Sequence, residues 1–61
     1  MKRNALLKIL HGMGCEFVNH GKKHDRFTQP VTGKTEMVPR HNDIDENLAK
    51  AIIKKLRNLP I

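Results

Sequence analysis

The sequence predicts a small α+β fold in the order α-β-β-β-α, with a three-stranded antiparallel sheet and two helices on one face. Apolar residues recur at helical spacing near both ends of the chain, over residues 4–13 and 44–59. Between these segments, short stretches of alternating apolar and polar residues are separated by turns that contain glycine or proline. With 61 residues, the chain is expected to form one domain over residues 1–61.

The first helix is expected over residues 4–13. Its apolar residues fall on one stripe with the spacing of a core-facing side: Leu6, Ile9, Leu10 and Met13. Asn4 is the expected N-cap, because its side-chain oxygen can accept a hydrogen bond from an N–H of the first turn. Gly14 suits the left-handed residue that often follows the end of a helix.

Three short strands are expected, over residues 15–20, 24–29 and 35–38. Pro39 cannot donate a hydrogen bond to a strand ladder, so the third strand must end there or lie at the edge of the sheet. The alternation leaves open whether Met37 or Val38 points inward.

The alternation also divides side chains between the two faces of the sheet. If Phe17 and Phe27 point toward the helices, strand periodicity places His24 and Arg26 on the opposite, open face. Cys15 shares the face of Phe17.

The last helix begins with a capping box, in which Asp43 is the expected cap and Glu46 reaches back to it. Its apolar residues form the expected core stripe: Ile44, Leu48, Ile52, Leu56 and Leu59. Its basic residues lie on the opposite side, where a solvated face is expected: Lys50, Lys54 and Arg57. Pro60 is expected to end this helix.

The charge balance points to a polyanionic partner. Twelve Lys and Arg residues against six Asp and Glu residues give a formal net charge of +6. A positive field on a small body attracts nucleic acid, anionic lipid or an acidic protein. No segment combines a basic face with the bulky aromatic surface of a membrane-lying helix, which disfavours lipid.

A cytoplasmic location is expected. Residues 5–13 mix apolar and polar side chains, so they are expected to form neither a signal peptide nor a membrane span. Cys15 is the single cysteine, which excludes an intramolecular disulfide and fits a reducing compartment. Its apolar neighbourhood disfavours a role as a nucleophile.

Four histidines are candidates for chemistry. His11 is expected at the surface of the first helix, whereas His20 and His24 flank a three-residue turn and can face each other across it. A zinc site would need His20, His24 and His41 together. Since there is no CxxC motif, no HExxH motif and no carboxylate cluster, neither a metal site nor another cofactor is expected.

RNA cleavage needs little more than a histidine among cations, because the substrate supplies its own nucleophile, the 2′-hydroxyl. An imidazole with a pKa of about 6.5 can take or give a proton near neutrality. Cations stabilise the charge that develops on the phosphate. His24 has such neighbours in the sequence or across the expected sheet, and they are the candidate RNA-binding residues: Lys22, Lys23, Arg26, Lys34 and Arg40. By itself, a histidine among lysines is more often an ordinary surface residue.

Several short motifs in this order resemble the HicA toxins of HicA–HicB toxin–antitoxin systems. The matching pieces are Gly14, Gly21-Lys22-Lys23-His24, Val38-Pro39-Arg40-His41 and the helix from Leu48 to Leu56. The resemblance implies a fold like that of double-stranded-RNA-binding domains and a metal-independent ribonuclease acting on mRNA, with His24 at the catalytic position. It also implies a cognate HicB-like antitoxin. Many members read Gly-Ser-His, whereas this chain has a longer turn without serine.

Three functions are therefore considered. In an endoribonuclease toxin, His24 is the general acid/base, and Lys23, His20 and His41 are candidates for the second proton-transfer group. In a non-catalytic RNA-binding module, His24 is only a contact residue. A DNA-binding regulator is least favoured, because two helices separated by a sheet do not form a helix-turn-helix, and no DNA contact by this chain alone is expected.

Overall fold

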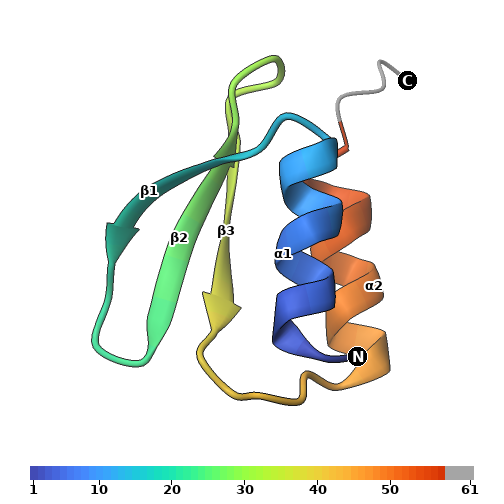
Figure 1. Ribbon diagram of the computed structural model, residues 1–61. Helices are drawn as coiled ribbons and strands as arrows, with labels where there is room; N and C mark the ends of the chain where they lie inside the picture. The colour runs from blue at the N-terminus through green and yellow to red at the C-terminus, as the bar shows by residue number, and fades with distance from the viewer. Residues whose placement is uncertain (58–61) are drawn as a thin grey trace.

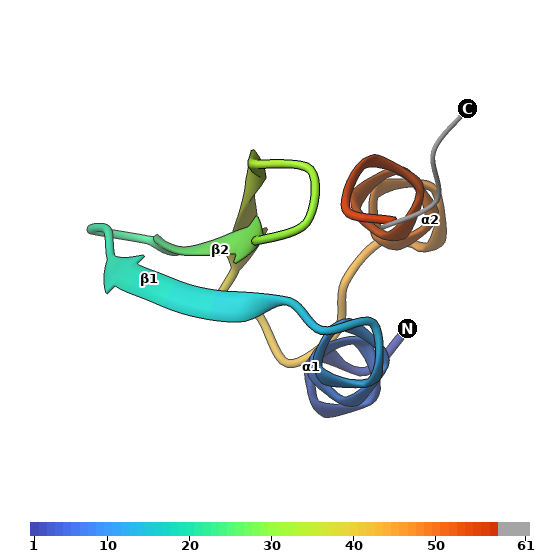
Figure 2. The same cartoon turned by 90° about the horizontal axis from the view of Figure 1, so that it is seen from above.

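The computed structural model describes residues 1–57 and has its elements in the predicted order. They are α1 (Arg3–Gly12), β1 (Glu16–His20), β2 (His24–Gln29), β3 (Lys34–Pro39) and α2 (Glu46–Lys55) (Figure 1). Seen from above, both helices lie on the same side of the sheet (Figure 2). The predicted α+β fold is confirmed, while the predictions for Leu59 and Pro60 lie outside the described residues.

The strands form one antiparallel sheet in the order β1-β2-β3. The pairing of β2 with β3 is regular, and it ends where His24 lies opposite Pro39. The pairing of β1 with β2 has an irregularity between Phe17 and Asn19, after which His20 lies opposite Asp25. Because a bulge inserts one residue into one strand, it moves every later side chain of that strand to the other face.

The core lies between the helices and the inner face of the sheet. It consists of Leu6, Leu10, Cys15, Val38, Ile44, Ala49, Ile52 and Leu56. The structure resolves the open choice in β3, since Val38 is 0% exposed and Met37 is 37% exposed. The prediction that Leu48 is a core residue is wrong, because α2 begins only at Glu46 and turns Ala49 inward instead.

Both predicted helix caps are wrong. The N-cap of α1 is Lys2 and not Asn4, because the backbone N–H of Arg3 already bonds the carbonyl of Asn42 and α1 starts earlier. The cap of α2 is Asp45, whose side chain accepts from the N–H groups of residues 47 and 48 at 3.0 and 3.2 Å. Asp43 instead pairs with the ammonium of Lys2 at 2.9 Å. The left-handed Gly14 after α1 is confirmed, with φ of 85°.

The helices pack against the sheet mainly through β3 and leave β1 uncovered. All five residues of β1 are exposed, including Phe17, which was expected to face the helices. Phe17 does share a face with Phe27, and their rings meet edge to face with centroids 5.7 Å apart. Of these two rings, only that of Phe27 packs against the core, where it is partly buried.

Gln29, at the end of β2, joins the sheet to the ends of both helices. It is 0% exposed. Its Nε2 donates to the carbonyls of Met13 at 2.9 Å and Leu56 at 3.1 Å, and its Oε1 accepts from the N–H of Val31 at 3.2 Å. One amide side chain therefore satisfies backbone groups of three segments.

Replacing this amide by an apolar group should destabilise the fold. For Gln29→Leu we expect a loss of about 2–3 kcal/mol in the free energy of unfolding, because buried backbone groups lose their partners. Urea unfolding measures this loss. Thr28→Val removes only an exposed hydrogen bond from the neighbouring position and should change stability by less than about 0.5 kcal/mol. Equal midpoints for Gln29→Leu and the unmodified chain would contradict the assigned role.

Candidate functional site

His24 opens β2 on the face of the sheet that carries no helix. Within β2, Asp25 and Gln29 are buried, while His24 and Arg26 are exposed. This pattern places His24 and Arg26 on the open face, as the alternation predicted. Within residues 1–57, the His24 imidazole has no hydrogen-bond partner.

The hairpin loop between β1 and β2 brings the residues before His24 close to its backbone. The N–H of Gly21 donates to the carbonyl of His24 at 2.6 Å. A Cβ atom at position 21 would lie 2.8 Å from that same oxygen, closer than real Cβ atoms approach backbone. Only glycine therefore fits this turn, which gives a physical reason for the glycine three residues before the histidine.

The predicted cationic neighbours of His24 are only partly assembled around it. Lys22 and Lys23 are exposed in the adjoining loop, and Arg26 is exposed two residues along β2. Lys34 pairs with Gln29 at the other end of the sheet. That pair lies five positions along β2 from His24, roughly 16 Å at about 3.3 Å per residue.

Two further predicted residues follow β3. Arg40 lies at the same end of the sheet as His24 but turns its side chain to the helix side, where it binds Asp25. His41 is exposed in the loop that leads to α2. The Arg40 side chain therefore does not join His24 on the open face, where the sequence had suggested it.

A carboxylate that the sequence analysis passed over organises the helix side of this region. Asp25 has only 8% of its side chain exposed. Its Oδ2 accepts from Arg3 Nη2 at 2.5 Å, and its Oδ1 accepts from Arg40 Nε at 2.9 Å and lies 2.8 Å from His20 Nδ1. The carboxylate thus connects α1, the hairpin and the end of β3. The available signal was a charged residue at an inward-facing strand position, which needs partners.

The same contacts extend to the backbone. Arg3 Nε donates to the carbonyl of Pro39 at 2.9 Å, and Arg40 Nη2 donates to the carbonyl of Gly21 at 2.5 Å. The backbone N–H of Arg40 also donates to the carbonyl of Lys23 at 3.4 Å. Arg40 therefore holds the hairpin loop against the end of β3.

The bulge in β1 places His20 beside Asp25 and away from His24. The expectation that His20 and His24 face each other across the turn is wrong, because the extra residue turns His20 to the helix side. Its side chain is 71% exposed, and its ring lies 4.6 Å from that of Phe17. With Nδ1 held by the carboxylate, Nε2 is the ring nitrogen that remains for a ligand or a proton.

The hydrogen bond from His20 and the charge and hydrogen bond of Arg40 hold the pKa of Asp25 below its ordinary value, although burial acts in the opposite direction. The ionised carboxylate is therefore the form that the folded state favours. By contrast, burial raises the pKa of the Cys15 thiol, whose Sγ lies 3.6 Å from the carbonyl of Leu56. That thiol is not activated as a nucleophile.

Residues 1–57 contain no group of three or more His, Cys, Asp or Glu side chains arranged to hold a metal ion. The set of His20, His24 and His41 is not assembled, because His20 and His24 lie on opposite faces of the sheet. Neither α1 nor α2 is long and apolar enough to cross a membrane.

Loss of the Asp25 charge should lower stability most at neutral pH. A carboxyl whose pKa is lowered by folding stabilises the folded state above its ordinary pKa, and this contribution is lost as the pH falls through the folded-state value. Asp25→Asn should therefore have a lower free energy of unfolding than the unmodified chain at neutral pH. The difference between the two free energies, the gap, should narrow in strong acid. Urea unfolding across this range measures the gap.

Asp43→Asn is the matched control, because it makes the same chemical change in an ion pair whose side chains are 71% and 75% exposed. Exposed pairs contribute little, so this variant should stay close to the unmodified chain at every pH. Equal losses of stability in the two variants would show that the Asp25 cluster stabilises the fold no more than an exposed ion pair does.

Comparison with known proteins identifies one family. The family described as "HicA toxin of bacterial toxin-antitoxin" matches residues 3–57, a span that includes all five elements, Asp25 and His24. No curated protein and no solved structure matches the chain significantly. The family is known for RNase-like toxins, and a toxin–antitoxin system implies a cognate antitoxin. The chain therefore belongs to the HicA toxin family of bacterial toxin–antitoxin systems.

Proposed function

We propose that this chain is an endoribonuclease toxin, an mRNA interferase that cleaves RNA in the cytoplasm with His24 as a general acid/base. The observation that carries the proposal is the position of His24, exposed on the open face at the hairpin end of the sheet, in a chain that matches the family over residues 3–57. An exposed imidazole at this position is accessible to an extended polyanion.

The proposed reaction uses the 2′-hydroxyl of the substrate as the nucleophile. His24 takes its proton as the oxygen attacks the adjacent phosphorus, the bond to the 5′-oxygen breaks, and that oxygen is protonated as it leaves. The products are a 2′,3′-cyclic phosphate and a 5′-hydroxyl, so atoms and charge balance without a metal ion or another cofactor. One positioned proton-transfer group contributes on the order of 10²–10⁴-fold to such a rate.

A second group must protonate the leaving oxygen. Lys23 precedes His24 directly and lies in the exposed hairpin loop. His20 has an oriented ring but on the helix side, and His41 lies beyond the end of β3. Among these candidates, Lys23 is favoured, because it adjoins His24 in the chain and is exposed in the hairpin loop.

Electrostatic attraction is the proposed basis of RNA binding. The cationic residues nearest to His24 along the chain are Lys22, Lys23 and Arg26, and all three are exposed. Of the remaining predicted RNA-binding residues, Arg40 borders the hairpin loop, whereas Lys34 lies at the far end of the sheet and is expected to contribute least. Phosphate contacts of this kind give affinity without sequence preference.

The cognate antitoxin is proposed to be HicB-like and to act by covering the open face around His24. A protein lying there excludes RNA sterically and offsets the local positive charge of the hairpin loop. This face is free of helices and exposes His24, Arg26 and Met37, so it offers both polar and apolar contacts.

A second candidate function is a non-catalytic RNA-binding module of the same fold. It is favoured by one observation, the lack of any hydrogen bond that orients the His24 imidazole within residues 1–57. Incubation of the purified chain with end-labelled RNA separates the two functions, because only an enzyme produces fragments.

Removing the imidazole should abolish cleavage and leave the fold intact. For His24→Ala we expect at least a 10²-fold lower cleavage rate, because one proton-transfer group is lost. The rate is measured on labelled RNA with excess EDTA present, and circular dichroism reports folding. His11→Ala, an equivalent change at an exposed position on α1, should cleave normally. Unchanged cleavage by folded His24→Ala would exclude this histidine from the reaction.

Charge removal at the hairpin should weaken RNA binding more than charge removal on α2. The double variants Lys22→Ala/Lys23→Ala and Lys50→Ala/Lys54→Ala lower the net charge equally. Each phosphate of single-stranded RNA that no longer meets a lysine should reduce the slope of log affinity against log salt by roughly 0.7. We expect that reduction only for the hairpin variant, measured by fluorescence anisotropy. A larger effect of the α2 variant would place the RNA elsewhere.

A further inference from the structure

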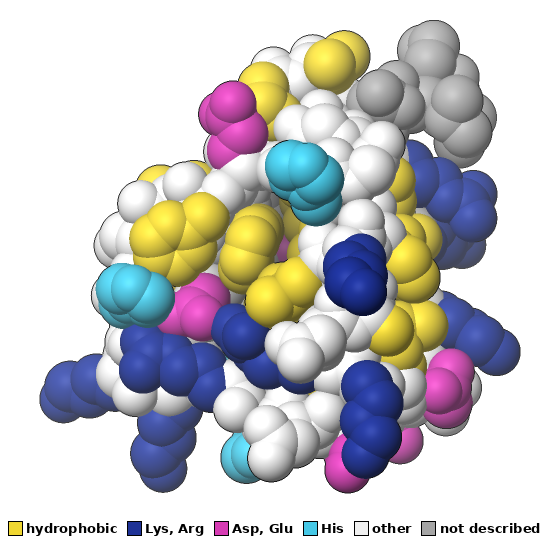
Figure 3. Space-filling view, in the orientation of Figure 1, with side chains coloured by type: hydrophobic (Ala, Val, Ile, Leu, Met, Phe, Trp, Pro, Cys, Tyr) yellow, Lys and Arg dark blue, Asp and Glu magenta, His cyan; other side chains and the backbone are white. Residues whose placement is uncertain are grey.

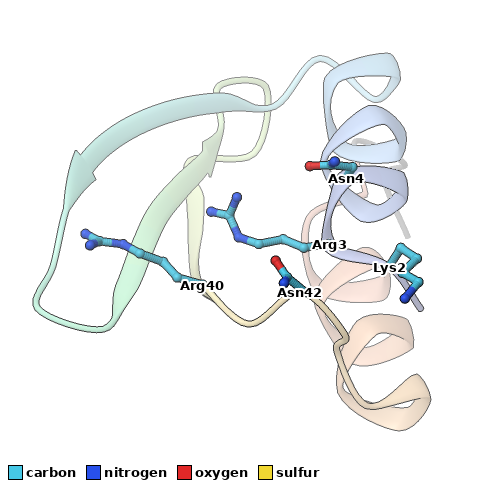
Figure 4. Close-up of a pocket in the computed structure, with 5 residues that line it drawn as sticks. All are labelled: Lys2, Arg3, Asn4, Arg40 and Asn42. Carbon is cyan, nitrogen blue, oxygen red and sulfur yellow. The ribbon is translucent and has the colours of Figure 1, made fainter.

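A basic pocket lies beside the Asp25 cluster, on the helix side of the sheet. Its described lining comes from the start of α1 and the chain that follows β3: Lys2, Arg3, Asn4, Arg40 and Asn42. Three of these side chains are cationic, two are amides and none is acidic. Figure 4 shows Arg3 reaching from α1 and Arg40 from the end of β3, both toward the strands.

The two guanidinium groups are held in place and still have donors to offer. Each uses Nε and Nη2 within the protein, Arg3 on Pro39 and Asp25, and Arg40 on Asp25 and Gly21. In each case Nη1 has no partner among residues 1–57. Since only 20% of the Arg3 side chain is exposed, its guanidinium is a built part of the pocket wall and not a mobile surface charge.

The backbone at this end of α1 adds donors of the same kind. Lys2 provides no side-chain cap. The N–H of Arg3 bonds Asn42, but those of Asn4 and Ala5 have no acceptor among the described residues. By contrast, Asp45 caps the first turn of α2. The cations of the pocket thus stand beside free N–H groups that carry partial positive charge.

The chemistry of this pocket is that of an oxyanion site. Guanidinium, ammonium and amide donors suit the oxygens of a phosphate, which accept several hydrogen bonds at once. The carboxylate nearest the guanidiniums, Asp25, is shared by two arginines and His20, so it does not neutralise them fully. Lys2 pairs with Asp43 in an exposed ion pair that a ligand can displace at little cost.

We propose that this pocket binds a backbone phosphate of the RNA, as a second contact away from the cleaved bond. The proposal rests on the proposed ribonuclease function and extends it. Arg40 links this pocket to the hairpin loop before His24, because it lines the pocket and also bonds the loop at Gly21 and Lys23. Basic side chains gather around that end of the molecule (Figure 3). In this proposal, an RNA strand bound at His24 passes around the hairpin end of the sheet, by way of Arg40, to the pocket on the helix side.

Asn4→Asp tests the proposal without removing any contact seen in the structure. It puts a negative charge into the pocket, and an acidic residue in the first turn of a helix is favourable, so the fold should be kept. Asn47→Asp is the matched control. Asn47 is exposed and is the second residue of α2, as Asn4 is of α1, and both changes lower the net charge by one.

The readouts are the KM and kcat of RNA cleavage, and RNA affinity measured in the non-cleaving His24→Ala background. Asn4→Asp should raise KM and weaken affinity about tenfold relative to Asn47→Asp, with kcat unchanged. Equal affinities of the two variants would overturn the pocket assignment. An unmodified chain that does not cleave RNA would refute the ribonuclease function. The affinity measurement would still test the pocket, because it does not depend on cleavage.

Amide NMR shifts of residues 4 and 5 distinguish RNA from free phosphate as the ligand. A short RNA should move these resonances at lower concentrations than inorganic phosphate does, and Asn4→Asp should suppress the response. Resonances that respond to inorganic phosphate but not to RNA would overturn the proposal.

Discussion

The buried carboxylate of Asp25 is the interaction on which the hairpin end of this protein depends. A charge on the inner face of a strand is costly unless it is paired and hydrogen-bonded. Here the carboxylate is hydrogen-bonded by three side chains, Arg3 of α1, Arg40 at the end of β3 and His20 of β1. Since each donor belongs to a different segment, one side chain sets how these three segments meet beyond the apolar core.

Adjacent residues of β2 thereby take opposite roles. Asp25 points to the helices and anchors the hairpin, while His24 points to open solvent. Gly21 permits the close approach of the loop to the His24 carbonyl, and Arg40 clamps the same loop from the other side. The exposed histidine therefore has a well-supported backbone, while its imidazole has no hydrogen-bond partner among residues 1–57.

The helices cover β3 and the neighbouring part of β2 but not β1. This incomplete cover leaves two different surfaces at one end of the molecule. One is the open face with His24, and the other is the basic pocket at the start of α1. Arg40 belongs to the border between them, because it contacts both the hairpin loop and the Asp25 cluster. A polyanion is the kind of ligand that both surfaces favour.

The sequence by itself determined the order of the elements and the outward position of His24, because helical and strand periodicities are local properties. Its short motifs also pointed to the family that matches residues 3–57. Only the tertiary structure decided the caps, the burial of Ala49 in place of Leu48, and the face of His20. A single bulge moves the later side chains of a strand to the other face of the sheet. A helix that begins two residues later than expected can turn a different set of side chains toward the core. Asp25 bonds a side chain 22 positions away in the sequence, and no local pattern encodes such a meeting.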